Sequence, residues 1–331
     1  MKRRILAVQA ALVGLVFALA ADASAEAIYS LGEVQPYAVS QADRGAGGDA
    51  AKAQPATAGS AEEESTPVER RVKEEQAVLS HSRWAILPHK PNYILPYTYN
   101  DSVNNEPFQE VDPDVPDLDN SEAKFQISFK LPLWERMFGS NADLYFAYTQ
   151  ISFWQVYNTE NSSPFRDTNY EPEGVVVLHT DNALGGFKNR QLAFGLVHQS
   201  NGRGLDELSR SWNRIYASGT LEKGKFASSL KVWYRLPEDE EDDDNPDIED
   251  YLGYGELRAG YRWGNHVFAT MLRNNLQTGD NRGAIELDWS FPLLPKLKGY
   301  VQYFYGYGES LIDYDHKNNR IGVGVLLSDW L

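Results

Sequence analysis

The sequence predicts an all-β fold, a transmembrane antiparallel β-barrel of about twelve strands. Three observations predict it: an N-terminus with the features of an export signal, a series of short segments in which apolar and polar residues alternate, and connections that alternate between short and long. A soluble β-sandwich would show the same alternation within its strands. The export signal and the even number of strands favour the membrane barrel.

The first residues predict the compartment. Lys2 and the two arginines after it form a basic region, residues 5–21 are almost continuously apolar, and Ala23 to Ala25 has the pattern of a cleavage site. We interpret residues 1–25 as a secretory signal peptide. A membrane anchor is the alternative, but the apolar run is short for a spanning helix.

Residues 26–79 differ in composition from the rest of the chain. They are rich in alanine, glycine and glutamate, and no apolar period runs through them. Such a segment has too little apolar surface to offset the entropy of ordering the chain. We therefore expect a disordered periplasmic extension at 26–79 and a barrel domain at 80–331.

Segments of strand character follow one another from residue 92, each bounded by Gly, Pro, Asn or Asp. They are 92–99, 123–134, 142–157, 169–179, 191–198, 213–221, 226–235, 250–261, 266–275, 282–291, 298–307 and 318–327. Short connections at 222–225 and 263–265 alternate with long ones, as in barrels with short periplasmic turns and long outer loops. The connection 181–190 falls where a short turn is expected and is predicted to be longer.

The two faces of the strands have different characters. In 318–327, Ile321, Val323, Val325 and Leu327 share one face and glycines share the other. In 250–261, one face carries Glu256 and Arg258, which we expect to line a polar interior. A barrel of this size is narrow enough for side chains to fill, so no wide aqueous pore is expected.

Composition excludes several classes of function. The chain has no cysteine, which excludes disulfides, thiol nucleophiles and thiolate metal sites. Its formal net charge of −16 and the lack of a basic stripe argue against a nucleic-acid partner. The acidic run 238–250 is interpreted as a solvated outer loop.

His198 and Ser200 are the candidate catalytic pair. They lie two residues apart at a strand end, so their side chains point to the same face, where histidine can act as a base for the hydroxyl. That face continues through Leu196 and Phe194, which in a barrel meets lipid. Asn213 begins the next strand and can orient the imidazole. The alternative is that His198 and Ser200 merely end a strand.

Five segments resemble the outer membrane phospholipase A family. They are 162–172, 198–203, 209–214, 244–248 and 306–314. The resemblance covers the chain from about residue 92 onward. Three features depart from the family pattern. The loop between His198 and Asn213 is about one residue longer than in the best-known member, the chain ends in Trp330-Leu331 rather than in an aromatic residue, and the N-terminal extension is longer than the family needs.

The resemblance implies a role for each matching position. Ser200 is the nucleophile, His198 the base and Asn213 its orienting partner, and the backbone N–H of Gly202 contributes to an oxyanion hole. A calcium ion would be bound across a homodimer, with the Arg203 carbonyl and Ser209 from one protomer and the partner subunit's Ser162. Oxygen ligands suit a hard cation such as calcium. The position of Gln150 implies a hydrogen bond across the dimer interface.

The resemblance therefore implies a calcium-dependent phospholipase of the bacterial outer membrane, active as a homodimer. It would cleave sn-1 and sn-2 acyl esters of glycerophospholipids and lysophospholipids. Two alternatives from other classes are a catalytically inert small porin or structural barrel, and a soluble periplasmic esterase.

Overall fold

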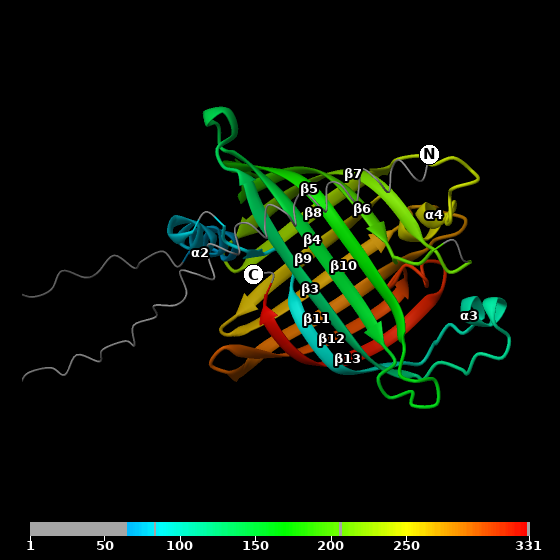
Figure 1. Ribbon diagram of the computed structural model, residues 1–331. Coiled ribbons are helices and arrows are strands. Elements are labelled where there is room, and N and C mark those ends of the chain that lie inside the picture. The colour runs from blue at the N-terminus through cyan, green and yellow to red at the C-terminus, as the bar shows by residue number, and fades with distance from the viewer. Residues whose placement is uncertain (1–64, 83, 205–206, 330–331) are drawn as a thin grey trace, which may run out of the picture. The chain divides into compact units, whose positions relative to one another are not determined.

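Residues 65–329, except 83, 205 and 206, are described by a computed structural model and form a closed antiparallel barrel (Figure 1). Each long strand pairs with its neighbours in the sequence, and the last one pairs with the first to close the ring. The predicted signal peptide, and the predicted extension as far as residue 64, lie outside the described residues.

Twelve long strands build the barrel, which confirms the predicted fold class. They are β2 (Asn92–Asn100), β3 (Ser121–Trp134), β4 (Ala142–Trp154), β5 (Phe165–Leu184), β6 (Phe187–Ser200), β7 (Ser211–Lys223), β8 (Phe226–Arg235), β9 (Gly255–Trp263), β10 (His266–Asn274), β11 (Gly283–Leu294), β12 (Leu297–Tyr307) and β13 (Lys317–Ser328). A two-residue strand, β1 (Leu87–Pro88), pairs with β3.

Short helices accompany the strands. They are α2 (Pro67–His81), α3 (Glu106–Val111), α4 (Ile248–Leu252) and the 3₁₀ turn η1 (Met137–Gly139). None of the described helices combines the length and the apolar character that crossing a bilayer requires.

Two connections differ from the prediction. The segment 181–190 is not a long loop, because β5 and β6 continue to a tight turn at Gly185 and Gly186. Both glycines have positive φ, +58° and +81°, which this two-residue hairpin turn requires. The predicted strand 250–261 begins only at Gly255, because α4 occupies the preceding residues and the chain reverses at Gly253 with φ +67°.

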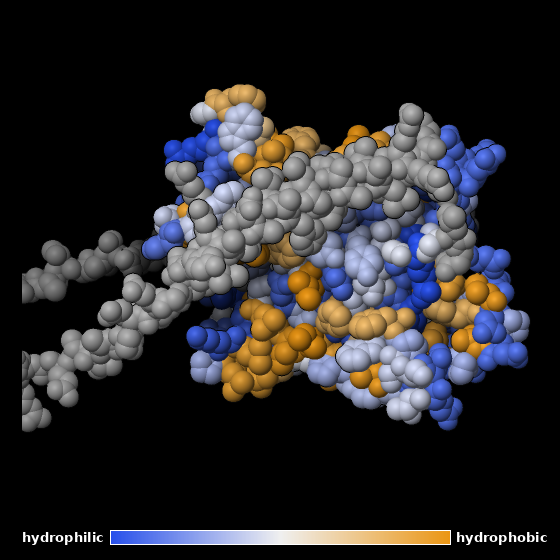
Figure 2. Space-filling view, viewed as in Figure 1, coloured by the Kyte–Doolittle hydropathy of each residue, from blue (hydrophilic) through white to orange (hydrophobic). Residues whose placement is uncertain are grey.

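Alternation within the strands separates an apolar outside from a polar inside, as predicted. Ile321 and Leu327 are 50% and 62% exposed, whereas Gly322 between them faces inward and is buried. On β9, Arg258 bonds Glu256 at 3.0 Å on the inner face. Figure 2 shows apolar side chains in patches over the strands and hydrophilic residues at the loop end. The outer wall therefore suits contact with lipid.

Paired charges fill the lumen. Glu122 bonds Arg166 at 3.0 Å and Arg320 at 2.8 Å, and Glu309 bonds Lys124 at 2.9 Å. All five side chains are almost completely buried, so each charge needs its partner to offset the loss of hydration. Cavities of about 190 Å³ and 120 Å³ lie among interior groups such as these. The filled lumen agrees with the prediction that no wide aqueous pore is present.

Helix α2 corrects the prediction that residues up to 79 are disordered. It lies at the end of the barrel that carries the short turns (Figure 1). Buried Glu222 accepts hydrogen bonds from the backbone N–H of Val68, at 2.9 Å, and from the hydroxyl of Thr66, and it also pairs with Arg190. Ionic contacts hold this helix together with a short apolar side on which Val68 is buried and Leu79 packs against the core, and that side is too sparse to show as an apolar period in the sequence.

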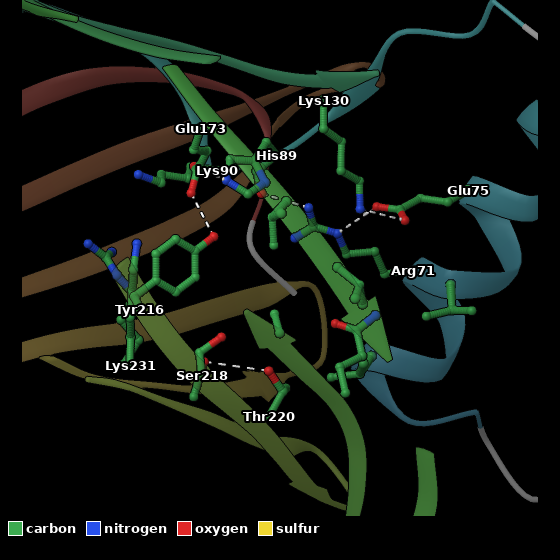
Figure 3. A pocket seen from close by; sticks show the side chains of 18 of the residues that line it. Arg71, Glu75, His89, Lys90, Lys130, Glu173, Tyr216, Ser218, Thr220 and Lys231 are labelled. Carbon is green, nitrogen blue, oxygen red and sulfur yellow. Dashed lines mark hydrogen bonds and ion pairs between the residues drawn. The ribbon is translucent and has the colours of Figure 1, made fainter. Parts of the chain in front are cut away.

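A second group of contacts holds the middle of α2, as Figure 3 shows. Glu75 pairs with Lys130 of β3 at 2.9 Å, and Arg71 donates to the carbonyl oxygens of Pro88 and His89 at 2.9 and 2.8 Å. Burial by itself would raise the pKa of the Glu75 carboxyl, but Lys130 and Arg71 hold this pKa below its usual value. The Glu75 carboxylate is therefore charged. Residues of α2 and of the barrel interior line the same cavity, so the helix covers one end of the lumen.

Glu222→Ala tests this attachment. The substitution removes the acceptor of the first turn of α2, so we expect tryptic cleavage at Arg70 and Arg71 to become about tenfold faster while the barrel remains folded. Limited proteolysis with mass spectrometry measures the rate, and heat-dependent mobility in gels reports the barrel. Glu74→Ala, at an exposed position of α2, is the control. Equal rates for all three proteins would contradict the attachment.

Candidate active site

The register of β6 and β7 brings the candidate base and its orienting residue together on the outer wall. His198 lies directly opposite Asn213, and the imidazole Nδ1 lies 2.9 Å from the Asn213 Oδ1. Leu196, on the same face of β6, is 55% exposed, whereas Val197 between them is 1% exposed. The predicted orientation of this face toward the outside is confirmed.

The contact between His198 and Asn213 determines which nitrogen of the imidazole carries the proton. A carboxamide oxygen only accepts hydrogen bonds, so Nδ1 carries the hydrogen and donates it. The neutral ring then has its lone pair on Nε2. Nε2 is the atom that can accept a proton from a neighbouring hydroxyl.

Ser200 lies two residues beyond His198 on the same face, at the end of β6. It stands opposite Tyr170 of β5 and Ser211 of β7. Within the described residues, Ser200 forms no hydrogen bond with His198. Residues i and i+2 of a strand are about 7 Å apart at Cα, so rotation of the two side chains is needed to bring the hydroxyl to the ring.

Gly202 turns the chain sharply after Ser200. Its φ is +68°, and a Cβ at this position would lie 2.7 Å from the ring of Tyr170. Only glycine fits both the backbone conformation and the space. Buried Asn201 fixes the turn, since its Nδ2 donates to the Leu208 carbonyl at 2.7 Å and its Oδ1 accepts from the Arg210 N–H at 3.1 Å.

The predicted metal ligands Arg203 and Ser209 flank this loop. The Ser209 hydroxyl donates to a carboxylate oxygen of Asp244 at 2.7 Å, and the Arg203 guanidinium donates to the Arg166 carbonyl at 2.9 Å. Within the described residues, no three Asp, Glu, His or Cys side chains gather as a metal site. The Ser209 hydroxyl and the Asp244 carboxylate are oxygen donors in contact with each other, and the Arg203 carbonyl belongs to the same loop as Ser209. This all-oxygen set suits a hard cation.

Ser162 lies apart from these donors, in the loop between β4 and β5. It is exposed, has a φ of +53°, and forms no hydrogen bond with Arg203 or Ser209 among the described residues. Within one chain, Arg203 and Ser209 therefore lie in the loop between β6 and β7, whereas Ser162 lies in the loop between β4 and β5.

Gln150 lies on the outer face of β4, level with Ser200. It stands opposite Tyr170, which in turn stands opposite Ser200, so the three residues form a row across β4, β5 and β6. Adjacent strands are about 4.8 Å apart, which separates Gln150 from Ser200 by about 10 Å. Gln150 also accepts from the Tyr148 hydroxyl at 3.1 Å and donates to Ser152 at 3.1 Å. This uncharged polar group lies among apolar outer-wall residues.

The sequence suggested that the acidic loop after β8 is solvated, but two of its carboxylates contact residues of the candidate site. Besides Asp244, it supplies Glu238, whose Oε1 accepts from Asn213 Nδ2 at 2.8 Å. Burial raises the pKa of Glu238, and so do Asp243 and Asp244, while Asn213 and Arg235 lower it; the net shift is upward. The sequence reasoning missed this residue. A signal for it was present in the sequence. The tight turn between β7 and β8 fixes a register in which Arg235 pairs with Arg214, so the residues that follow Arg235 must lie near Asn213.

Comparisons with known proteins identify the family to which the sequence is similar. The sequence matches the profile of the phospholipase A1 family over residues 68–327. It is 44% identical over 255 residues to a putative phospholipase A1 of Neisseria meningitidis serogroup B, a match that spans 74% of this chain and 65% of the relative, just under two thirds of its length. It is 41% identical over 246 residues to the phospholipase A1 of Escherichia coli K12, spanning 74% of this chain and 82% of the relative.

Solved structures give the same result. Outer membrane phospholipase A from E. coli superposes with a TM-score of 0.69 at 38% identity, covering 75% of this chain and all of that chain. The E. coli protein has also been solved as an active-site mutant in which an asparagine is replaced by alanine. The Salmonella typhi outer membrane phospholipase, solved as a dimer with bound calcium, has a TM-score of 0.69 at 39% identity, covering 74% of this chain and 93% of that chain.

A serine-reactive sulfonyl fluoride tests whether this constellation activates Ser200. We expect the reagent to modify Ser200, as mapped by peptide mass spectrometry, and His198→Ala to slow the modification by about 100-fold because the base is lost. Ser211→Ala removes a neighbouring hydroxyl and is the control with unchanged labelling. Labelling that is indifferent to His198 would contradict the assignment.

Proposed function

The chain belongs to the phospholipase A1 family, and from this premise we propose that it hydrolyses acyl esters of membrane phospholipids with Ser200 as nucleophile, His198 as base and Asn213 as orienting residue. It is a β-barrel of the bacterial outer membrane. The observation that carries the proposal is the hydrogen bond between His198 and Asn213 on an apolar outer wall.

The wall around the site accounts for how substrate arrives. Phe194, Leu196 and Ile215 are about half exposed on the face that carries His198 and Ser200. Acyl chains of a phospholipid that lies against these side chains stay in an apolar environment, and the ester is brought to the end of β6. An uncharged asparagine suits this position better than a carboxylate, because a charge beside hydrocarbon has a large desolvation cost.

The chemical step follows from the ring proton. His198 Nε2 removes the Ser200 proton as Oγ attacks the ester carbonyl carbon, and the C–O bond to the glycerol oxygen breaks after His198 returns the proton to it. Water then releases the fatty acid from Ser200 by the same route. The N–H of Gly202, in the turn directly after the nucleophile, is proposed to stabilise the oxyanion.

We propose calcium as the cofactor, held by the Arg203 carbonyl and the Ser209 hydroxyl together with the partner subunit's Ser162. The oxygen donors and the carboxylate of Asp244 behind Ser209 suit this ion. When bound, calcium would supply positive charge near the developing oxyanion. The calcium-bound dimer of the S. typhi relative supports the assignment.

We further propose that the active form is a homodimer joined through the wall that carries Gln150. Its amide, already paired with Tyr148 and Ser152, is a polar group in an apolar wall and gains from a matching partner. Dimerisation would then complete the calcium site. The rate of hydrolysis would then depend on how much phospholipid is present in the outer leaflet, because that phospholipid is the substrate.

The proposed specificity covers sn-1 and sn-2 esters of glycerophospholipids and also lysophospholipids. An open wall, rather than an enclosed pocket, imposes little selection on which chain of the lipid approaches Ser200. The inert small porin is less well supported, because ion pairs such as Lys124 with Glu309 fill the lumen that a porin keeps open.

Ser200→Ala tests the proposed nucleophile. In mixed detergent–phospholipid micelles with calcium, we expect fatty-acid release to fall by about a thousandfold or more, because no other group replaces the hydroxyl. Ser211→Ala, opposite it on β7, is the matched control and keeps its activity. Undiminished release from Ser200→Ala would refute the proposal, and conductance in planar bilayers without hydrolysis would support the porin.

Ser209→Ala tests the proposed calcium site. Loss of one oxygen ligand is expected to raise the calcium concentration for half-maximal hydrolysis by about tenfold, with the maximal rate at saturating calcium changed less. Ser209→Thr retains a hydroxyl and should stay close to the wild type. A calcium requirement that is the same in all three proteins would exclude Ser209 as a ligand.

A further inference from the structure

Glu238 is joined to the catalytic constellation through Asn213. Its Oε1 accepts a hydrogen bond from Asn213 Nδ2 at 2.8 Å, while Asn213 Oδ1 faces His198 Nδ1 at 2.9 Å. Both groups of the carboxamide are thus used, one on each side. The carboxylate is half-buried and lies in the loop after β8.

The loop that carries Glu238 is attached to β7 on both sides of this residue. Before it, the N–H of Leu236 donates to the Asn213 carbonyl at 2.8 Å. After it, Asn245 Oδ1 accepts from the Ser211 N–H at 2.9 Å. Asn245 is completely buried, so the far attachment is shielded from water. These two attachments to β7, one on each side of Glu238 in the chain, hold its side chain next to Asn213.

A carboxylate determines which way a carboxamide turns. An ionised carboxylate only accepts hydrogen bonds, so only the NH₂ group of Asn213 can face Glu238. The Asn213 oxygen must then face His198. The reverse orientation would place NH₂ against Nδ1, leave the ring hydrogen on Nε2, and remove the lone pair that accepts the Ser200 proton.

We propose that Glu238 is a positioning residue for the hydrolysis, which fixes the Asn213 carboxamide and through it the Nδ1–H tautomer of His198. The inference rests on the proposed function, since it concerns the same serine and histidine. Glu238 touches neither substrate nor reacting atoms. Its carboxylate is connected to the imidazole through two hydrogen bonds, both of them made by Asn213.

Kinetics of Glu238 variants test this role. Glu238→Ala leaves the carboxamide free to turn, so we expect kcat to fall by about tenfold with KM unchanged. Glu238→Gln can accept from Asn213 through its oxygen but can also donate through its NH₂ group, so it leaves the carboxamide partly free to turn, and kcat should fall by less than in Glu238→Ala. Glu240→Ala removes an exposed carboxylate from the same loop and controls for loop charge.

The ring proton is read directly by ¹⁵N NMR of histidine-labelled protein, with His198→Ala identifying the signal. We expect the Nδ1–H tautomer in the wild type, in Glu240→Ala and in Ser200→Ala, and a mixture of tautomers in Glu238→Ala. Unchanged kcat and tautomer in Glu238→Ala, or an equal loss in Glu240→Ala, would overturn the inference. Retained hydrolysis in Ser200→Ala would instead refute the proposed function and leave the tautomer result standing.

Discussion

The pairing of β6 with β7 in one register is the constraint on which the site depends. It sets His198 opposite Asn213, and strand alternation then directs both side chains, together with Ser200, to the outside of the barrel. A shift of β6 by one residue would turn His198 and Ser200 toward the lumen and away from Asn213. The tight turn at Gly185 and Gly186 joins β5 to β6, and the pairing of these two strands sets Ser200 opposite Tyr170.

The lumen and the outer wall divide the chemistry of the chain between them. Charged groups such as Arg166, Glu122 and Arg320 face inward and neutralise one another, so the interior is filled and the outer wall remains apolar. The proposed catalytic groups are polar but uncharged side chains on that wall, as is Gln150. Carboxylates reach this site from a loop, through Glu238 behind Asn213 and Asp244 behind Ser209.

Alternation and turn residues made most of the fold predictable. The period of two located twelve strands and the outward face of His198, because lipid and lumen impose opposite polarity on neighbouring residues. Helix α2 was missed because its attachment through Glu222 and Glu75 involves partners far away in the sequence. Glu238 was missed for a related reason: a run of acids has the same composition whether it is solvated or held by a neighbouring strand.

The direction in which the site faces is tested most directly by fluorescence quenching. The chain has no cysteine, so Leu196→Cys carries a single probe on the face of His198 and Ser200. In phospholipid vesicles, we expect quenching by lipids brominated on their acyl chains and protection from a water-soluble quencher. Quenching by the aqueous reagent alone would place this face in water and contradict a serine that acts on lipid from the outer wall.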